Sequence, residues 1–469
     1  MKITEIRTQL FEYPIKRRRG DAHDPGGRSH QNGALVEILT DTEHRGFAIG
    51  SVNSVFGIAR LKRVLIGADP RQNAGLWQSM VNTIFKSGNN GVLNEGLAAL
   101  DIALWDLKAK SYGEPLWRLL GAKSNRVLAY ASGGDMPLND EQLTAFYGHM
   151  ASLGFRAAKL KIGLDIEEDA HRLALVRDVM TVKGKPPALM VDASEYWSAK
   201  QAVRRIARLE QEFDLTWVEE PVQRADYRGL AKVSSHIRAP VCAGENLKNV
   251  LEFQTYIEHG SADIVQVGRM MSGFTGAMQV GNLAYANGLP CAGSDSECKV
   301  FAHVAAALPN HMILEVHDDE VEEPMLKADN WIEDGHVVLG DSPGLGMTVD
   351  CDILKAHAVE APRPGRSGAG WSGRRPGAGL MEVPATDEER RIAALPAGET
   401  HDADQSPRFG RRAGNDRQAW RCNRILSPAH AGRRPQIWSR PDRNEWRGLA
   451  GARPQAGGSR GHPALPALP

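Results

Sequence analysis

The chain has 469 residues, 42% of them hydrophobic, with 57 basic and 57 acidic residues. This length exceeds one ordinary domain and predicts two or three. No run of 18 apolar residues occurs, which argues against a membrane span, and the first residues lack the apolar stretch of a secretory signal peptide. A zero net charge, if evenly spread, also argues against nucleic acid or a membrane surface as partner. We therefore expect a cytoplasmic protein.

The charge, however, is not evenly spread. Residues 361–469 contain 19 Arg, no Lys and 10 acidic residues, a net charge of +9, so the preceding residues carry −9. We expect 360–469 to be a disordered, low-complexity Arg/Gly/Pro/Ala tail, because this composition buries too little apolar surface to offset chain entropy. Two interpretations stay open: a basic tail that contacts nucleic acid or a partner, or the product of a shifted reading frame in GC-rich DNA. For residues 1–359 no nucleic-acid partner is expected.

The first part of the chain has the pattern of a small α+β unit. Strands are predicted at 2–13 and 34–40, and the polar, Gly-rich segment 17–33 between them is predicted to be a long loop. Amphipathic helical patterns follow at about 57–66, 71–85 and 94–111. The last of them has a broad apolar face, so this unit is expected to pack a helix against its sheet.

From about residue 127 the pattern changes to short apolar strands that alternate with amphipathic helices. Eight strands in this arrangement favour a parallel (β/α)8-type barrel, with a doubly wound open sheet as the alternative. In a barrel, chemistry is expected at the carboxyl ends of the strands. The predicted strands are 127–131, 157–162, 188–192, 216–219, 240–243, 263–267, 289–292 and 313–316.

Two lysines lie near the end of the second predicted barrel strand. Lys159 and Lys161 are two residues apart, so the period of a strand places both on one face, and in a barrel we expect them to point into its mouth. Two ammonium groups this close lower each other's pKa, which would make a lysine a usable base near neutral pH. The alternative for this motif alone is a solvated edge strand.

A carboxylate closes each of the next three predicted strands. These residues are Asp192, Glu219 and Glu245, at spacings of 27 and 26 residues. In a barrel they would converge at the top, where three carboxylates repel one another unless a hard cation lies between them. Ligation by oxygen alone favours Mg²⁺ over zinc. Each carboxylate by itself is also explained by a helix cap or a salt bridge.

Taken together, these motifs resemble the enolase superfamily, in its mandelate racemase/muconate lactonizing enzyme branch. The resemblance covers about residues 1–359 and rests on the segment ALWDL, the KxK strand, the strand ends VDA, VEEP and GEN, and a late PGLG. It implies a (β/α)7β TIM-like barrel at 123–320 with an N-terminal α+β capping domain at 1–122. Residues 321–359 would complete the cap. It also implies a homo-oligomer, whose size the sequence does not indicate.

The resemblance further implies roles for the residues at the strand ends. Mg²⁺ would be held by Asp192, Glu219 and Glu245, with Glu220 as a neighbour of the metal ligands. In this family the substrate is a carboxylate that loses its α-proton, and the metal and a lysine stabilise the negative charge that forms.

The same resemblance assigns the proton transfer to the lysine pair. Lys161 would be the base, and Lys159 would lie near the substrate carboxylate and tune that base. Ser194, beyond the third strand, and Glu315, at the end of the last strand, would contact the substrate.

In one respect the sequence departs from the pattern. Many members carry a second base, a His on the seventh strand held by an Asp on the sixth. Here Asp295 stands in the place of that His, and Gly268 stands in the place of that Asp. Two-base racemisation is therefore not expected, whereas dehydration by one base remains. The acid for the leaving hydroxyl would be protonated Lys161, Asp295, or a loop histidine, His23 or His30, with His23 also a candidate substrate contact. Asp295 as a helix cap and the histidines as solvated loop residues are the alternatives.

The sequence thus predicts a Mg²⁺-dependent hydro-lyase that dehydrates a sugar acid, an aldonate or aldarate, to a 2-keto-3-deoxy acid. The expected partner is a small hydroxy-carboxylate. A racemase, epimerase or cycloisomerase of the same superfamily is the alternative within this class, and a non-catalytic metal-binding homologue is the alternative outside it. The pattern does not indicate which acid sugar is the substrate.

Overall fold

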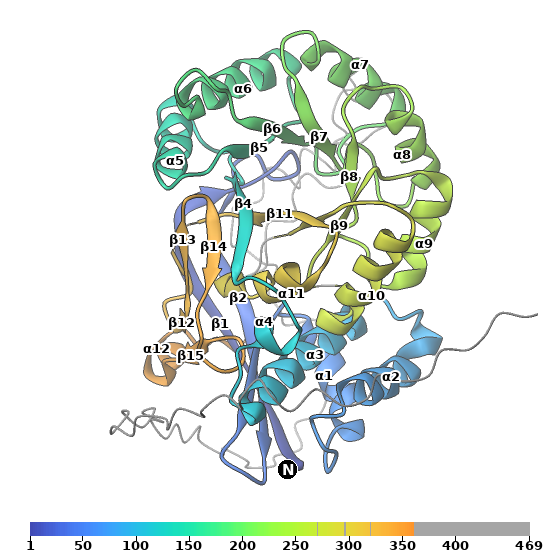
Figure 1. Ribbon diagram of the computed structural model, residues 1–469, viewed down its shortest axis with the longest axis vertical. Coiled ribbons are helices and arrows are strands. Elements are labelled where there is room, and N and C mark those ends of the chain that lie inside the picture. The colour runs from blue at the N-terminus through green and yellow to red at the C-terminus, as the bar shows by residue number, and fades with distance from the viewer. Residues whose placement is uncertain (270, 295–296, 319, 361–469) are drawn as a thin grey trace, which may run out of the picture. The chain divides into compact units, whose positions relative to one another are not determined.

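A computed structural model describes residues 1–269, 271–294, 297–318 and 320–360, so the predicted tail and Asp295 lie outside the described residues. The central feature is a closed barrel of eight parallel strands, β4 to β11, in which β11 pairs with β4. Helices surround these strands on the outside (Figure 1). This closure confirms the predicted barrel and excludes the doubly wound open sheet.

All eight predicted barrel strands are confirmed, with ends that differ by no more than two residues. The strands are β4 (Arg126–Ser132), β5 (Ala157–Lys161), β6 (Ala188–Asp192), β7 (Leu215–Glu219), β8 (Val241–Ala243), β9 (Ile264–Val267), β10 (Cys291–Gly293) and β11 (His311–Val316). The helices that follow them are α5 (Asp140–Ser152), α6 (Ile166–Met180), α7 (Ala199–Leu209), α8 (Tyr227–Ser234), α9 (Val250–His259), α10 (Gly273–Ala286) and α11 (Ala302–Ala307), with the 3₁₀ turn η3 (Glu297–Lys299) before α11.

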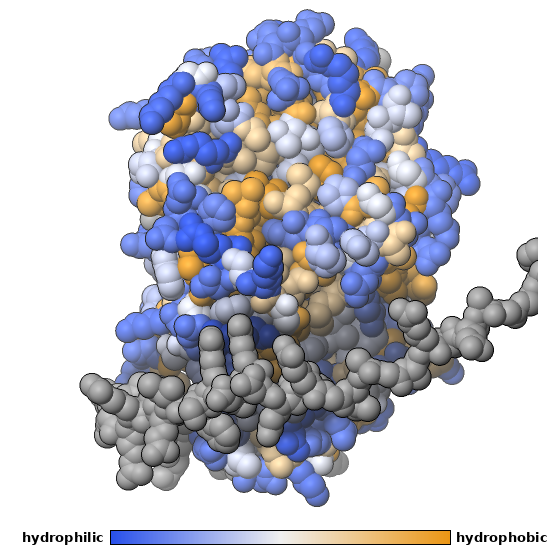
Figure 2. Space-filling view, in the orientation of Figure 1, coloured by the Kyte–Doolittle hydropathy of each residue, from blue (hydrophilic) through white to orange (hydrophobic). Residues whose placement is uncertain are grey.

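The barrel interior is filled by side chains from every strand, so it is a packed core. Tyr130 and Trp217 are fully buried and meet edge to face, with ring centroids 5.3 Å apart. The cluster is formed by Tyr130, Ala157, Met190, Trp217, Cys242, Ile264, Ala292 and Ile313. The outer surface of the helical ring carries mostly hydrophilic side chains (Figure 2). Among the described residues, no helix combines the length and apolar character needed to cross a membrane.

Several barrel helices begin at a side chain that accepts hydrogen bonds from the backbone of the first turn. Such caps satisfy donors that have no partner within the helix. They fix where each helix starts, and so they fix the short loops between strand ends and helices. The capping residues are Asn139 of α5, Asp165 of α6, Ser198 of α7, Asp226 of α8 and Asn249 of α9.

The N-terminal unit is an antiparallel sheet, β1 (Ile3–Arg19), β2 (Arg28–Thr40) and β3 (Arg45–Gly50), with four helices. The prediction of a loop over 17–33 is wrong for most of its length, because only residues 20–27 separate the two long strands. The helices are α1 (Ser54–Leu61), α2 (Asn73–Ile84), α3 (Gly91–Tyr112) and α4 (Leu116–Leu119), with 3₁₀ turns η1 (Lys62–Val64) and η2 (Phe85–Ser87).

The segment after the barrel contacts both the barrel and the N-terminal sheet. Its strand β14 pairs antiparallel with β4, whereas Ala358 forms a bridge to Phe11 of β1. The backbone N–H of Val359 also donates to the Leu10 carbonyl at 3.1 Å. The elements are β12 (Leu326–Ala328), β13 (Asn330–Glu333), β14 (His336–Leu339), β15 (Met347–Val349) and α12 (Cys351–Ala356).

Helix α10 receives its N-terminal cap from the N-terminal unit. Ser272, just before it, has a φ of +56° and makes no capping bond through its side chain. Instead, Asp101 of α3 accepts from the Thr275 backbone N–H at 2.8 Å and from the Thr275 hydroxyl at 2.7 Å. Gly273 has a φ of +77°, and a Cβ there would lie 2.5 Å from Asp101 Oδ2, so both backbone and space require glycine.

Candidate active site

The predicted base and two predicted metal ligands lie side by side across three neighbouring strands. Lys161 at the end of β5 is paired in register with Asp192 at the end of β6, and Asp192 is paired with Glu219 at the end of β7. Glu245 follows the end of β8 by two residues. Parallel strands present their carboxyl ends at the same edge of a sheet, so these four side chains share the mouth of the barrel.

The two lysines bind the carboxylates around them. Lys161 Nζ lies 2.5 Å from Asp192 Oδ2, and Lys159 Nζ lies 3.4 Å from the same oxygen. Lys159 also lies 2.7 Å from Glu315 Oε1 and forms an ion pair with Glu219. The Lys159 side chain is buried, whereas 15% of the Lys161 side chain is exposed. Lys161 is therefore the lysine that a ligand in the barrel mouth can reach.

These contacts overturn the expectation that the lysine pair lowers its own pKa. Burial and the neighbouring Lys159 charge both act to lower the pKa of Lys161, but the charge of Asp192, with Glu245 and Glu219 beyond it, raises it above the ordinary value. The pKa of Lys159 is likewise raised. The like-charge effect is present, but the carboxylates outweigh it.

The carboxylates in turn fall into two classes. Burial and nearby carboxylates raise the pKa of Glu219, Glu220 and Glu245. Burial also acts to raise the pKa of Asp192, but the charges of Lys161 and Lys159 outweigh it and lower that pKa. Lys159 has the same effect on the pKa of Glu315. A site with such opposed shifts is typical of a functional centre.

The site has the donor chemistry and the charge that suit a hard divalent cation. Among the described residues, five buried or half-buried carboxylates stand at the barrel mouth with Lys159 and Lys161, and three of these acids end or follow consecutive strands with oxygen as their only donor type. Within the described part of the chain no three Asp, Glu, His or Cys side chains are grouped closely enough to hold a metal together. The ammonium groups lie against Asp192 and Glu219 instead, but the residues fit Mg²⁺ in type and in charge.

The loops that follow β6 and β7 have strained backbone and are joined by an ion pair. Ser194, Glu195 and Glu220 have φ values of +47°, +62° and +39°, in a region that is costly for residues other than glycine. Arg224 Nε donates to Glu195 Oε1 at 2.6 Å, which links the two loops. Asn246 donates to both Glu220 oxygens, at 3.0 and 2.9 Å. These contacts hold the loops beside the predicted ligands.

A cavity of about 690 Å³ opens at this side of the barrel mouth, and its lining includes Lys161, Ser194 and Glu245. His23, from the loop between β1 and β2, also lines it, and its Nε2 lies 2.7 Å from the Ser194 carbonyl. Lys161 Nζ lies 3.3 Å from the Ser194 hydroxyl. The structure thus brings His23 to the predicted base. His30, by contrast, lies within β2 and lines neither of the cavities at the mouth.

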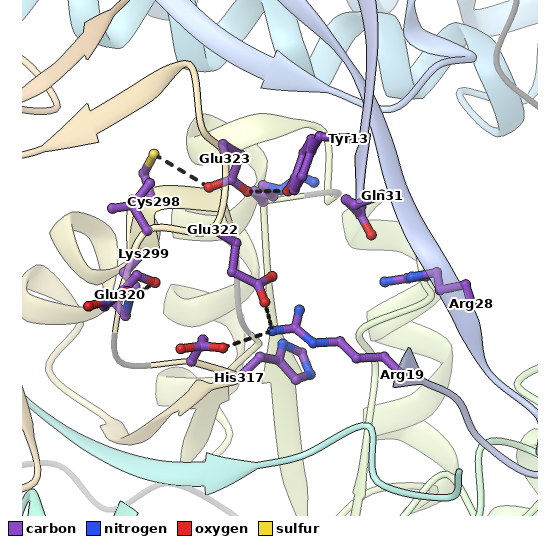
Figure 3. A pocket seen from close by; sticks show the side chains of 13 residues that line it. Tyr13, Arg19, Arg28, Gln31, Cys298, Lys299, His317, Glu320, Glu322 and Glu323 are labelled. Carbon is purple, nitrogen blue, oxygen red and sulfur yellow. Dashed lines mark hydrogen bonds and ion pairs between the residues drawn. The ribbon is translucent and has the colours of Figure 1, made fainter. Parts of the chain in front are cut away.

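A second cavity, of about 250 Å³, lies between the β1–β2 hairpin and the segment after β11. Figure 3 shows Arg19, Arg28 and His317 around this space, with the Arg28 guanidinium directed into it. Arg19 is paired with Glu322 at 2.7 Å. His317 lines this cavity and was not among the residues predicted from the sequence. A signal existed, because His317 follows Glu315 by two positions, and residues two apart in an extended strand lie on the same face.

Two family models match the chain. Residues 45–121 match the N-terminal domain of mandelate racemase / muconate lactonizing enzyme, and residues 143–353 match the enolase C-terminal domain-like model. The 3,6-anhydro-alpha-L-galactonate cycloisomerase of Streptomyces coelicolor is 30% identical over 385 residues, 76% of this chain and 99% of that protein. The arabinonate dehydratase of Saccharolobus solfataricus is 32% identical over 317 residues, 64% of this chain and 82% of that protein.

The fold has similar solved structures as well. The L-talarate dehydratase from Polaromonas sp. JS666, complexed with magnesium and L-glucarate, superposes with a TM-score of 0.69 at 29% identity, over 76% of this chain and 98% of that one. Epimerases and racemases are also among the relatives. From the two matched domains and these relatives, the chain belongs to the mandelate racemase/muconate lactonizing enzyme branch of the enolase superfamily.

Proposed function

We propose that this protein is a magnesium-dependent dehydratase of a sugar acid. It would remove the proton α to the substrate carboxylate and release the β-hydroxyl as water, to give a 2-keto-3-deoxy acid. The observation that carries the proposal is the row of Lys161, Asp192 and Glu219 in register on adjacent strands. Support comes from the arabinonate dehydratase relative and from the similar talarate dehydratase, which binds magnesium and L-glucarate.

The metal ligands in this proposal are Asp192, Glu219 and Glu245. Magnesium held by their oxygens would stabilise the negative charge that develops on the substrate carboxylate when the α-proton leaves. Glu220 does not ligate; it accepts from the Asn246 amide and so holds the loop that carries Glu245.

Lys161 is the proposed base, because its ammonium group lines the cavity at the mouth. The charge of Asp192 is the largest contribution that raises its pKa. Once that charge is neutralised, the nearby Lys159 and burial, which both act to lower the pKa, disfavour protonated Lys161. Ser194, His23 and Glu315 are proposed to contact the substrate around the reacting carbon.

The first test is to screen aldonates and aldarates for 2-keto acid formation with and without Mg²⁺. Lys161→Met should lower turnover by about 10³-fold, within the range for loss of a general base. Lys200→Met, on the exposed face of α7, is the matched control and should leave turnover unchanged. Full activity in Lys161→Met would refute this base. An isomeric product of unchanged mass would refute dehydration and favour the cycloisomerase alternative.

The ligand set is tested separately by calorimetry, without any substrate. Glu219→Gln and Asp192→Asn should each weaken Mg²⁺ binding by at least about tenfold, because each removes one charged oxygen donor. Gln201→Glu on α7 adds a carboxylate elsewhere and should not strengthen binding. Unchanged Mg²⁺ affinity in both ligand variants would contradict the proposed site.

A further inference from the structure

A histidine–carboxylate pair stands at the end of the last barrel strand. His317 Nε2 lies 3.6 Å from Glu315 Oε1, and the Glu315 side chain is 4% exposed. The His317 side chain is 27% exposed and lines the 250 Å³ cavity, where Figure 3 shows its ring beside the Arg19 side chain. The family pattern of a His on the seventh barrel strand with an Asp on the sixth is missing from the sequence. This chain has a similar histidine–carboxylate pair at the end of its eighth barrel strand, β11.

This pair is connected to the proposed base by an unbroken series of short contacts. Glu315 Oε1 lies 2.7 Å from Lys159 Nζ, which lies 3.4 Å from Asp192 Oδ2, the oxygen that binds Lys161 Nζ at 2.5 Å. The same Glu315 oxygen thus contacts Lys159 and His317. Lys161 lines one cavity at the mouth and His317 lines the other, and Lys159 and Glu315 connect them in this series of contacts.

Backbone contacts fix the segment that carries this histidine. Arg17 of β1 donates from Nη2 to the His317 carbonyl at 2.8 Å, and its Nη1 donates to the Gly133 carbonyl after β4. The hairpin of the N-terminal unit therefore ties the ends of β4 and β11 together. His317 is held in place by its main chain, and its side chain lines the cavity.

We infer that His317, oriented by Glu315, is the acid that protonates the departing hydroxyl. This inference rests on the proposed dehydration. Lys161 takes the α-proton, and the electron pair of that C–H bond passes into the carboxylate as an enediolate. When the enediolate collapses, a double bond forms between the α- and β-carbons and the bond between the β-carbon and its oxygen breaks. The oxygen keeps the electron pair of that carbon–oxygen bond, takes the His317 proton and leaves as water. The remaining enol tautomerises to the 2-keto acid, and solvent restores both protein groups.

His23 is the competing candidate, and its contacts differ in kind. Its Nε2 is directed at a backbone carbonyl, that of Ser194, which fixes the nitrogen as a donor to the protein. Ser194 also contacts Lys161 through its hydroxyl, so His23 and the proposed base line the same cavity. His317 has a carboxylate as its partner, which offers a counter-charge to an imidazolium, and the same Glu315 oxygen contacts Lys159.

The test separates proton abstraction from loss of the hydroxyl. In D₂O with Mg²⁺ and the best sugar-acid substrate of the wild-type enzyme, His317→Asn should lower 2-keto acid formation by at least about 10²-fold, the low end for a general acid. The enediolate that cannot expel hydroxide then returns to substrate and takes deuterium from Lys161, so recovered substrate carries label at the α-carbon. A β-fluoro analogue, whose fluoride leaves without a proton, should restore elimination in this variant to near the wild-type rate.

The controls make the assignment specific. His171→Asn, on the exposed face of α6, should retain both exchange and elimination, whereas Lys161→Met should lose both. Glu315→Gln should slow elimination and shift its pH profile. Unchanged elimination in His317→Asn would overturn the inference, and so would loss of exchange together with elimination, or the exchange-without-elimination result in His23→Asn. A wild-type enzyme that exchanges the α-proton but forms no keto acid would refute the dehydratase proposal itself. Failure of the proposed function is therefore seen in the wild-type enzyme, whereas failure of the His317 assignment is seen only in the variants.

Discussion

Among single residues, His303 is a buried histidine whose titration affects the stability of the fold. Its Nδ1 accepts from the Trp117 backbone N–H at 3.1 Å, and burial lowers its pKa to about 4. The unfolded-state value is near 6.5, so the folded state binds fewer protons between these two pH values. The neutral imidazole therefore contributes stability that is complete above about pH 6.5 and is lost as the pH falls toward 4. This loss amounts to about 3 kcal/mol.

The prediction is that His303→Asn removes this part of the pH dependence. Asn Oδ1 stands close to where Nδ1 was and can accept the same backbone hydrogen bond, but it does not titrate. We expect the free energy of unfolding to fall less steeply between pH 6.5 and 4 in the variant than in the wild type, as measured by urea titration at each pH. Parallel curves for the two proteins would contradict a buried, neutral His303.

The sequence predicted which residues meet at the site better than it predicted their charge states. Lys161, Asp192 and Glu219 were expected together because strand ends in a barrel converge, and they are in register. The direction of the Lys161 pKa was not predictable, since it depends on a 2.5 Å contact with Asp192. The two-residue spacing of Glu315 and His317 hints at a shared face, but their 3.6 Å approach depends on the backbone after β11, which ends at Val316.

At the scale of elements, the most consequential contact is the cap that α3 provides for α10. Asp101 is buried and accepts two hydrogen bonds from Thr275. We expect Asp101→Ala to lower the free energy of unfolding by about 2–3 kcal/mol, because a helix N-terminus and a hydroxyl both lose their buried acceptor. Chemical denaturation at pH 8 measures this change.

The matched control is Ser198→Ala, which removes the capping side chain of the exposed Ser198 of α7. Its expected cost is about 1 kcal/mol, and it involves no contact with the N-terminal unit. An Asp101→Ala cost no larger than that of Ser198→Ala would show that the acceptor contributes only as an ordinary cap.

Elements were predictable where the hydrophobic pattern is strong. The barrel strands are buried apolar runs, and each was placed to within two residues. Residues 17–19 and 28–33 of the β1–β2 hairpin were mistaken for a loop because they are polar or glycine. These residues are strands because their backbones pair with each other, as in Tyr13 with Gln31 and Arg19 with Arg28. Pairing of this kind leaves no trace in side-chain polarity.

At the scale of the whole molecule, the charge of residues 1–360 carries a prediction about anionic substrates. These residues bear a net −9, whereas the full chain is neutral. In a chain that ends at residue 360, we expect kcat/KM for a sugar acid to rise as ionic strength increases from 10 to 150 mM. Salt shortens the Debye length from about 30 to about 8 Å and so screens the repulsion between protein and substrate.

The truncated chain should remain folded, because β11 pairs with β4 and the barrel core is complete before residue 360. Circular dichroism checks this, and unfolding of the truncated chain would show that the fold depends on later residues. A kcat/KM that falls with added salt would instead mean that the local charge of Lys159, Lys161 and the metal determines encounter with the substrate.

The bridge between Phe11 and Ala358 has a consequence for biosynthesis. Glu12 and Leu10 of the first strand take their backbone partners from His357 and Val359, the last part of the described chain. A nascent chain cannot complete this sheet until residue 359 has left the ribosome. The first strand of the chain therefore waits for synthesis of the whole barrel before it gains its last backbone partners.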